Sequence, residues 1–271
     1  MIRCRPRDRT HRGGFLRRLT TALAAVLAGA ALLTLPAQAA GSAAPPDPAP
    51  GGPQRPYEPD VEGTDNVDSL DVTATRGPGQ SVTVAFDRRS RAAEGTTPAA
   101  ARRFVFLFDR SLSFRPESFP TCARAVVEAD GPAACPSGSL VGEGLGTWPD
   151  GSEHDVTVVN TRVDGTPGVL VVIPGVDTIL EQTFERVRDP YYGDYRWAAD
   201  EILPPSPVPP QERVGTTRFQ LSFGATREHR GSTVGFVETT ARPGDKLRFG
   251  LWSEFVTGQV VLPTATAPLR P

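Results

Sequence analysis

The side chains best suited to acid–base or nucleophilic chemistry are His154 in SEHDV, His229 in REHRG and Ser139 in SGSLVG. A serine hydrolase needs a histidine beside an activated serine. Ser139 lacks the G-x-S-x-G spacing of a nucleophile elbow, and its β context offers no strand, turn and helix to expose it. We therefore predict no catalytic residue and interpret both histidines as solvent-facing residues of loops or strand ends.

Carboxylates offer a second kind of chemistry. The segment 60–71, DVEGTDNVDSLD, has five acids and Asn66, and such oxygens could coordinate calcium. Its spacing differs from the D-x-[DN]-x-[DN]-G loop, because Gly63 precedes Asp65, and the chain has no H-E-x-x-H pair for zinc. We predict no metal and no cofactor, with calcium at this segment as the alternative. A glycosidase that uses two carboxylates across a cleft is not recognisable from the sequence alone.

The segment 189–201, DPYYGDYRWAADE, holds three of the four tyrosines and one of the three tryptophans within seven residues. Aromatic rings beside carboxylates are used in sugar-binding platforms and protein contacts, because rings bury area at low entropy cost. The alternative, which we favour, is a long proline-rich loop whose rings pin it to the domain. The residues of the candidate binding surface are Tyr191, Tyr192, Tyr195, Trp197 and Asp194.

Cys122 and Cys135 stand thirteen positions apart, and the third cysteine, Cys4, precedes the apolar run of the leader. An even pair in an oxidising compartment predicts a disulfide. Redox or nucleophilic chemistry would favour a C-x-x-C spacing or a nearby histidine, and the sequence shows neither. The intervening ARAVVEADGPAA predicts a short helix after Thr121, a candidate N-cap. We expect the bond to staple this helix onto the following strand.

The stretches SLSFRPESFPTC, ACPSGSLVGEG and VGFVETTARPGDKLRFGLWSEF resemble a family of uncharacterised secreted β-rich proteins of actinobacteria. The specific motifs, F-P-x-C and C-P-x-x-S-x-V-G-x-G, lie within residues 119–144, and the resemblance extends over most of residues 69–262. Those proteins have a third cysteine after a later strand, where this chain has Ala241. The resemblance implies a β-rich fold and export from the cell, without a second disulfide, and it implies no particular chemistry.

The first 39 residues have the organisation of a secretory signal peptide. Seven arginines precede the uncharged run at 19–35, and Ala37 and Ala39 occupy the small-residue positions of a cleavage site. A retained membrane anchor is the alternative, because the run is almost long enough to span a bilayer. Cleavage takes away seven of the 29 basic residues and one of the 31 acidic ones, which leaves a net charge of about −8. Such a surface disfavours nucleic acid and anionic membranes as partners.

Beyond a leader rich in proline and glycine, apolar residues recur with a period of two. Leu70, Val72 and Ala74 alternate in SLDVTAT, and SVTVAFD follows the turn RGPGQ, which predicts a hairpin with one buried face. RRFVFLFD is apolar on successive residues and predicts a strand covered on both faces. Some nine or ten such segments predict an all-β protein, a single β-sandwich of Greek-key or jelly-roll type with the stapled helix.

We therefore predict a signal peptide at 1–39, a disordered Pro/Gly-rich leader at 40–66, a β-sandwich domain at 67–263 and a flexible C-terminal tail at 264–271. This organisation favours a secreted, non-catalytic binding or cell-envelope-associated protein, monomeric and without a stable membrane anchor. Its expected partners are cell-wall glycan or another envelope protein. The alternatives are a secreted hydrolase of glycans or esters on the same scaffold and a carrier of a small apolar ligand.

Overall fold

The computed structural model describes residues 43–95, 97–203 and 206–271 of the chain. The predicted signal peptide at 1–39 lies outside these residues. Within them, no helix is long and apolar enough to cross a membrane. Strands dominate the described part of the chain, so the predicted all-β class is confirmed.

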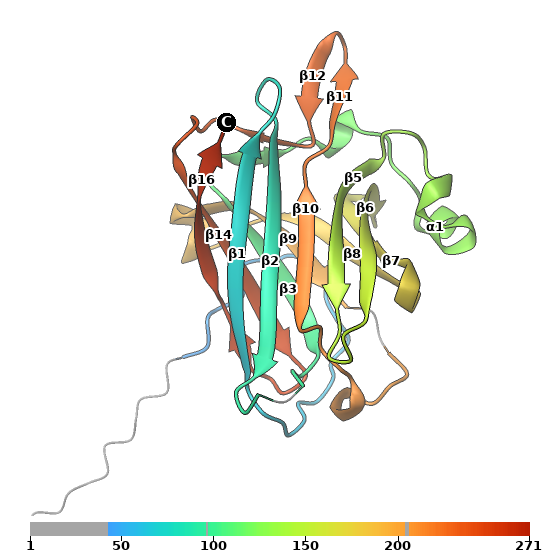
Figure 1. The fold of residues 1–271 in the computed structure, drawn as a ribbon, viewed down its shortest axis with the longest axis vertical. Coiled ribbons are helices and arrows are strands. Elements are labelled where there is room, and N and C mark those ends of the chain that lie inside the picture. The colour runs from blue at the N-terminus through green and yellow to red at the C-terminus, as the bar shows by residue number, and fades with distance from the viewer. Residues whose placement is uncertain (1–42, 96, 204–205) are drawn as a thin grey trace, which may run out of the picture. The chain divides into compact units, whose positions relative to one another are not determined.

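Most strands belong to one sheet of twelve (Figure 1). In the order of their pairing, they are β15 Val260–Val261, β14 Lys246–Phe255, β16 Thr264–Arg270, β1 Asn66–Arg76, β2 Val82–Ala92, β10 Arg218–Phe223, β5 Leu140–Thr147, β6 Glu153–Val163, β7 Thr166–Ile173, β8 Thr178–Arg186, β9 Tyr195–Ile202 and β3 Ala101–Asp109. Two small ladders join β4 Leu112–Phe114 to β13 Val237–Thr239 and β11 Thr226–His229 to β12 Ser232–Gly235. The helical segments are α1 Arg124–Asp130 and the 3-10 helices Pro116–Ser118, Pro132–Ala134, Pro174–Val176, Tyr191–Gly193 and Pro210–Glu212.

The sheet closes on itself, because β14 pairs with β16 on one side and with β3 on the other. Eleven strands thus form a barrel, antiparallel throughout except for the parallel pairing of β1 with β16. The predicted β-sandwich is therefore wrong. Alternating residues and short turns are common to sandwiches and barrels, and the pairing of Phe108 with Phe249, far apart in the sequence, decides between them. Closure removes the exposed edges that an open sheet would have.

The barrel interior is filled by apolar side chains. Val82, Val84 and Phe86 of β2 alternate inward and are buried, as their period of two predicts. Phe86 makes edge-to-face contacts with Phe106 and Phe108, each with ring centroids 5.2 Å apart. The middle of the barrel is therefore filled by side chains.

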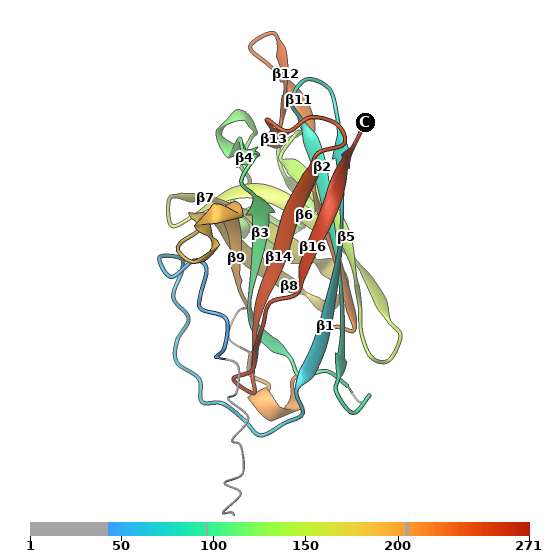
Figure 2. The same ribbon diagram turned by 90° about the vertical axis from the view of Figure 1, so that its left-hand side faces the viewer.

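The N-terminal segment, residues 43–65, runs along the outside of the barrel past β9 and β3 (Figure 2). The indole Nε1 of Trp252 donates to the carbonyl of Pro45 at 2.9 Å, and the hydroxyl of Tyr191 donates to the carbonyl of Pro46 at 2.9 Å. Ala49 is buried with Val105 in a small apolar cluster there. The predicted disordered leader at 40–66 is therefore attached to the barrel at these contacts, although most of its side chains are exposed, and its last residue, Asn66, begins β1. The segment helps cover the outer face of β3, which is buried on both faces as predicted.

The predicted flexible tail at 264–271 is wrong for Thr264–Arg270, which form β16 within the barrel wall. Ala267 and Leu269 of this strand are buried in the core. The inward positions are mostly alanine, so the apolar alternation of β16 is weak in the sequence.

The predicted disulfide between Cys122 and Cys135 is confirmed, and it encloses α1. Cys122 and Val127 pack on Val159 of β6 and Leu170 of β7, so the disulfide-linked segment covers the outer face of these strands. The helix begins after Ala123 without a side-chain cap, so the N-cap predicted at Thr121 is wrong. The segment is held to β6 rather than to the strand that follows it, through a hydrogen bond from the Cys122 amide to a β6 carbonyl at 2.9 Å.

Candidate functional site

A cavity of about 420 Å³ opens at the end of the barrel where β3 begins, the lower end in Figure 1. Its lining comes from chain segments that meet there: Ala101 at the start of β3, Ile173 at the end of β7, Thr178 at the start of β8, and the connection between β9 and β10. Ligand pockets commonly measure roughly 300–1,000 Å³. We call this space the mouth cavity.

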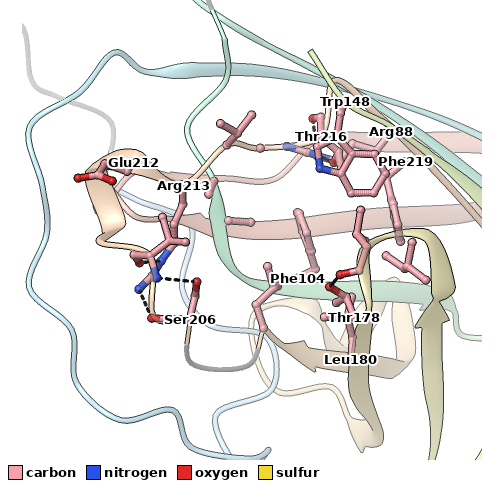
Figure 3. A pocket seen from close by; sticks show the side chains of 18 of the residues that line it. Arg88, Phe104, Trp148, Thr178, Leu180, Ser206, Glu212, Arg213, Thr216 and Phe219 are labelled. Carbon is pink, nitrogen blue, oxygen red and sulfur yellow. Dashed lines mark hydrogen bonds between the residues drawn. The ribbon is translucent and has the colours of Figure 1, made fainter. Parts of the chain in front are cut away.

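The inner wall of the mouth cavity is aromatic and aliphatic. Phe104, Phe219 and Leu180 line it and also belong to the core of the barrel, so the cavity ends on the outermost layer of the packed interior. Figure 3 shows Phe104, Phe219 and Trp148 toward one side, with Arg213 and its neighbours toward the other. The cavity therefore has an apolar side and a charged side.

A buried ion pair lies at the apolar side of the cavity. Nε of Arg88 on β2 is 2.6 Å from Asp68 Oδ2 on β1, and the hydroxyl of Ser90 donates to the same carboxylate at 2.6 Å. The Arg88 guanidinium lies 5.0 Å from the ring centroid of Phe104, a cation–π distance. Nη1 of Arg88 donates a hydrogen bond to the hydroxyl of Thr216 at 3.3 Å. The donors of Arg88 are thus engaged by protein groups, and the pair adds no net charge to the cavity.

Apolar side chains are also exposed around the opening of the cavity. Val176, Val208 and Val214 line it with exposed fractions of 37%, 42% and 51%. They are three of the seven large apolar side chains that the described residues expose. Clustered exposed apolar residues mark binding sites more often than scattered ones do.

The two arginines on the charged side of the cavity, Arg55 and Arg213, lie close to Glu58 of the N-terminal segment, which is outside the cavity lining. Arg213 donates two hydrogen bonds to the Glu58 carboxylate, at 2.7 and 2.9 Å, and Arg102 Nε lies 3.3 Å from it. The hydrogen bonds from Arg213 are the main reason why the pKa of Glu58 is lowered. Arg55 reaches the same carboxylate at 3.6 Å. The single carboxylate of Glu58 is therefore shared by three arginines.

The predicted aromatic surface at 189–201 is only partly exposed. Tyr192 is 69% exposed, whereas Tyr195 is buried and its hydroxyl donates to the carbonyl of Phe249 at 3.3 Å. Tyr191 is half-buried against the N-terminal segment, and the exposed Asp194 is hydrogen-bonded by Arg248. These side chains do not present a common exposed face.

Trp197 lies on β9 and packs against the core. Its ring meets that of Phe114 edge-to-face at 6.5 Å, and the guanidinium of Arg186 covers it at 3.8 Å from the centroid. Together with the burial of Tyr195, this geometry favours the packing role over the recognition role for the segment.

The sequence-derived candidates for nucleophilic chemistry are not brought together. Ser139 is fully buried and its hydroxyl donates to the carbonyl of Pro136 at 2.7 Å. The backbone of Ser139 lies beside Asn160 of β6, six residues along the strand from His154, or roughly 20 Å at the rise of a β-strand. His154 instead contacts Trp148 edge-to-face at 5.0 Å, and His229 lies on the β11–β12 hairpin at the other end of the barrel.

Two of the five acids of the segment 60–71 are paired with arginines. Asp60 accepts a hydrogen bond from Arg102 at 2.5 Å, and Asp68 pairs with Arg88. The described residues contain no group of three or more histidine, cysteine or acidic side chains placed to hold a metal ion.

The mouth cavity was not identified from the sequence. Its residues come from the N-terminal segment, β2, β3 and six later connections or strands, and no local spacing links them. The one relevant signal was the proline-rich connection PPSPVPPQERV, where Val208 stands between prolines and Val214 follows three polar residues. An exposed valine in a loop is too common to predict a site by itself.

No protein-family model matches the chain, and no curated protein or solved structure is significantly similar to it.

Proposed function

We propose that the protein is an exported, non-catalytic binding protein that takes a small, largely apolar ligand into the mouth cavity of the barrel. The proposal joins the predicted binding role to the predicted carrier alternative. In a barrel, however, the ligand enters at one end of the closed sheet rather than between two sheets.

The observation that carries this proposal is the continuity of apolar surface from the rim to the core. Exposed Val176 and Val214 stand at the opening, and Phe104 and Leu180 lie further in. An apolar ligand is removed from water along this whole path, and each buried methylene contributes about 0.8 kcal/mol. Specificity then depends on the few polar groups at the charged side.

A glycan-binding role at 189–201 has less support, because Tyr192 alone among the four aromatic residues there is well exposed. Sugar platforms need rings that stack on the ligand, and Tyr195 and Trp197 are engaged by the protein itself.

The test is a titration of the purified protein with N-phenyl-1-naphthylamine, a neutral apolar dye whose fluorescence rises on leaving water. We expect saturable binding to the wild-type protein. Val176→Asp and Val214→Asp, on separate segments of the opening, should each weaken binding at least tenfold, because a charge there must be desolvated when the ligand enters.

Val67→Asp is the matched control. Val67 is 44% exposed, comparable to the rim valines, but it lies on β1 outside the cavity lining. It should leave dye binding unchanged. The absence of saturable binding to the wild type, or an equal loss in all three variants, would refute the proposed site.

A further inference from the structure

Arg55 lies at the boundary between two hollows of the surface. It lines the mouth cavity, and it also lines a more polar hollow formed by residues 53–58 with Asp60, Arg102, Arg103 and Glu254. Its side chain is only 14% exposed. A cation in this place can face a polar group of a ligand while the rest of that ligand occupies the apolar cavity.

The guanidinium of Arg55 has more donors than partners. An arginine carries five N–H donors, and among the described residues Arg55 donates one hydrogen bond, from Nη1 to the carbonyl of Arg102 at 2.8 Å. Its nearest carboxylate oxygen, on Glu58, is 3.6 Å away, too far for a good hydrogen bond. By contrast, all three nitrogens of Arg213 are engaged, by Glu58, Val208 and Ser206.

The electrostatic surroundings of Arg55 are also short of negative charge. Its one close carboxylate, Glu58, is hydrogen-bonded by Arg213 and approached by Arg102. Burial lowers the pKa of Arg55 most, and the like charges of Arg213 and Arg102 lower it further, against the attraction of Glu58 and the weaker attraction of Glu254. The one acidic residue in the cavity lining, Glu212, is exposed to solvent. An additional anion beside Arg55 would therefore be stabilised by charge and by hydrogen bonds.

We propose that the ligand of the mouth cavity is an anionic amphiphile, whose single acidic head group is bound by Arg55 and whose apolar body lies against Phe104 and Leu180. This inference rests on the proposed function and narrows its ligand class. Arg55 is assigned to the head group because its donors are available, whereas those of Arg88 and Arg213 are satisfied within the protein.

The test compares decanoate, decanol and decylamine by isothermal titration calorimetry on the full exported chain at low and high salt. Decanoate should bind at least tenfold more tightly than decanol, decylamine should bind most weakly, and the preference for decanoate should shrink as salt rises. Arg55→Gln should weaken decanoate binding about tenfold and leave decanol binding unchanged, and Arg55→Lys should restore part of the loss.

Arg89→Gln is the control for net charge, because Arg89 is exposed on the outer side of β2 and does not line the cavity. It should leave all three affinities unchanged, and melting temperatures should show that each variant is folded. Equal binding of decanoate and decanol, or an Arg55→Gln variant with unchanged decanoate affinity, would overturn the inference while the proposed function stands. If none of the three compounds bound the wild type, the proposed function and the inference would both fail.

Discussion

The carboxyl group of Glu201 and the side-chain amide of Gln182 meet within the barrel wall, with 2.5 Å between Gln182 Nε2 and Glu201 Oε2. The two residues are register partners on β9 and β8, and both are fully buried. The other carboxyl oxygen of Glu201 has no hydrogen-bond partner among the described residues. Because burial disfavours the charged form, the pKa of Glu201 is raised to about 7.

Glu201 should make stability fall as pH rises. Its pKa is about 7 in the folded protein and 4.5 for the unperturbed group, so the folded state binds its proton more tightly. The stabilisation that Glu201 contributes through its proton is complete below pH 4.5 and is lost as pH rises through 7. The loss corresponds to about 3 kcal/mol. The measurement is the free energy of unfolding in urea between pH 4 and pH 8.

Glu201→Gln provides the comparison, because it keeps the shape and the hydrogen bond to Gln182 but does not titrate. The variant should gain stability relative to the wild type as pH rises from 4.5 to 7. Carboxylates that do not interact with Glu201 affect both proteins alike, so they cancel in the difference, whereas the neighbouring Asp200 does not cancel completely. A difference that stays constant with pH would mean that Glu201 is not a buried, protonated acid in the folded state.

Arg103 should contribute far more to the free energy of unfolding than its partially exposed partner Asp47 does. Arg103 binds the fully buried Asp200 through two hydrogen bonds, at 2.7 and 2.6 Å, and reaches Asp47 of the N-terminal segment at 2.7 Å. Arg103→Gln leaves the buried carboxyl of Asp200 without its cationic partner and should cost about 3–5 kcal/mol. Asp47→Asn, at a half-exposed site, should cost about 1 kcal/mol or less, and it should speed proteolytic cleavage between residues 43 and 60. Equal destabilisation by both substitutions in chemical denaturation would contradict this assignment.

The disulfide should hold the α1 segment on β6 and β7. Replacing both Cys122 and Cys135 by serine opens a loop with a sequence separation of 13 and should lower the free energy of unfolding by about 3 kcal/mol. Limited proteolysis of the variant should begin between residues 124 and 134. Denatured, unreduced protein that lacks the predicted signal peptide, and with it Cys4, should show no thiol in a labelling assay, and appreciable labelling would show that the bond does not form.

Alanine substitutions in the segment 189–201 should lower stability in proportion to the burial of the ring that is removed. Trp197→Ala removes a ring that packs on the core and should cost about 3 kcal/mol. Tyr192→Ala changes the exposed ring and should cost roughly 0.5 kcal/mol or less. Melting temperatures and pull-down on cell-wall preparations separate the two roles. Loss of cell-wall binding in Tyr192→Ala at unchanged stability would restore this segment as a recognition surface.

Local chemistry in the sequence was sufficient to predict several elements. The period of two in β2 identified Val82, Val84 and Phe86 as one buried face, and the unbroken apolar run of β3 predicted burial on both faces. The disulfide between Cys122 and Cys135 was predictable because the sequence has no other cysteine after the apolar run. These features depend on near neighbours in the chain.

The arrangement of the strands, and with it the candidate site, was decided only by tertiary structure. A period of two says which residues share a face, but it does not say which strand lies beside which. The pairing of β3 with β14 turns the expected sandwich into a barrel, and barrel closure gives Thr264–Arg270 a place in the wall. The mouth cavity exists because distant strand ends and the N-terminal segment converge there, which brings Arg55 close to Arg213 across more than 150 residues of sequence. Such contacts arise from burial summed over the whole chain, so no short stretch of residues encodes them.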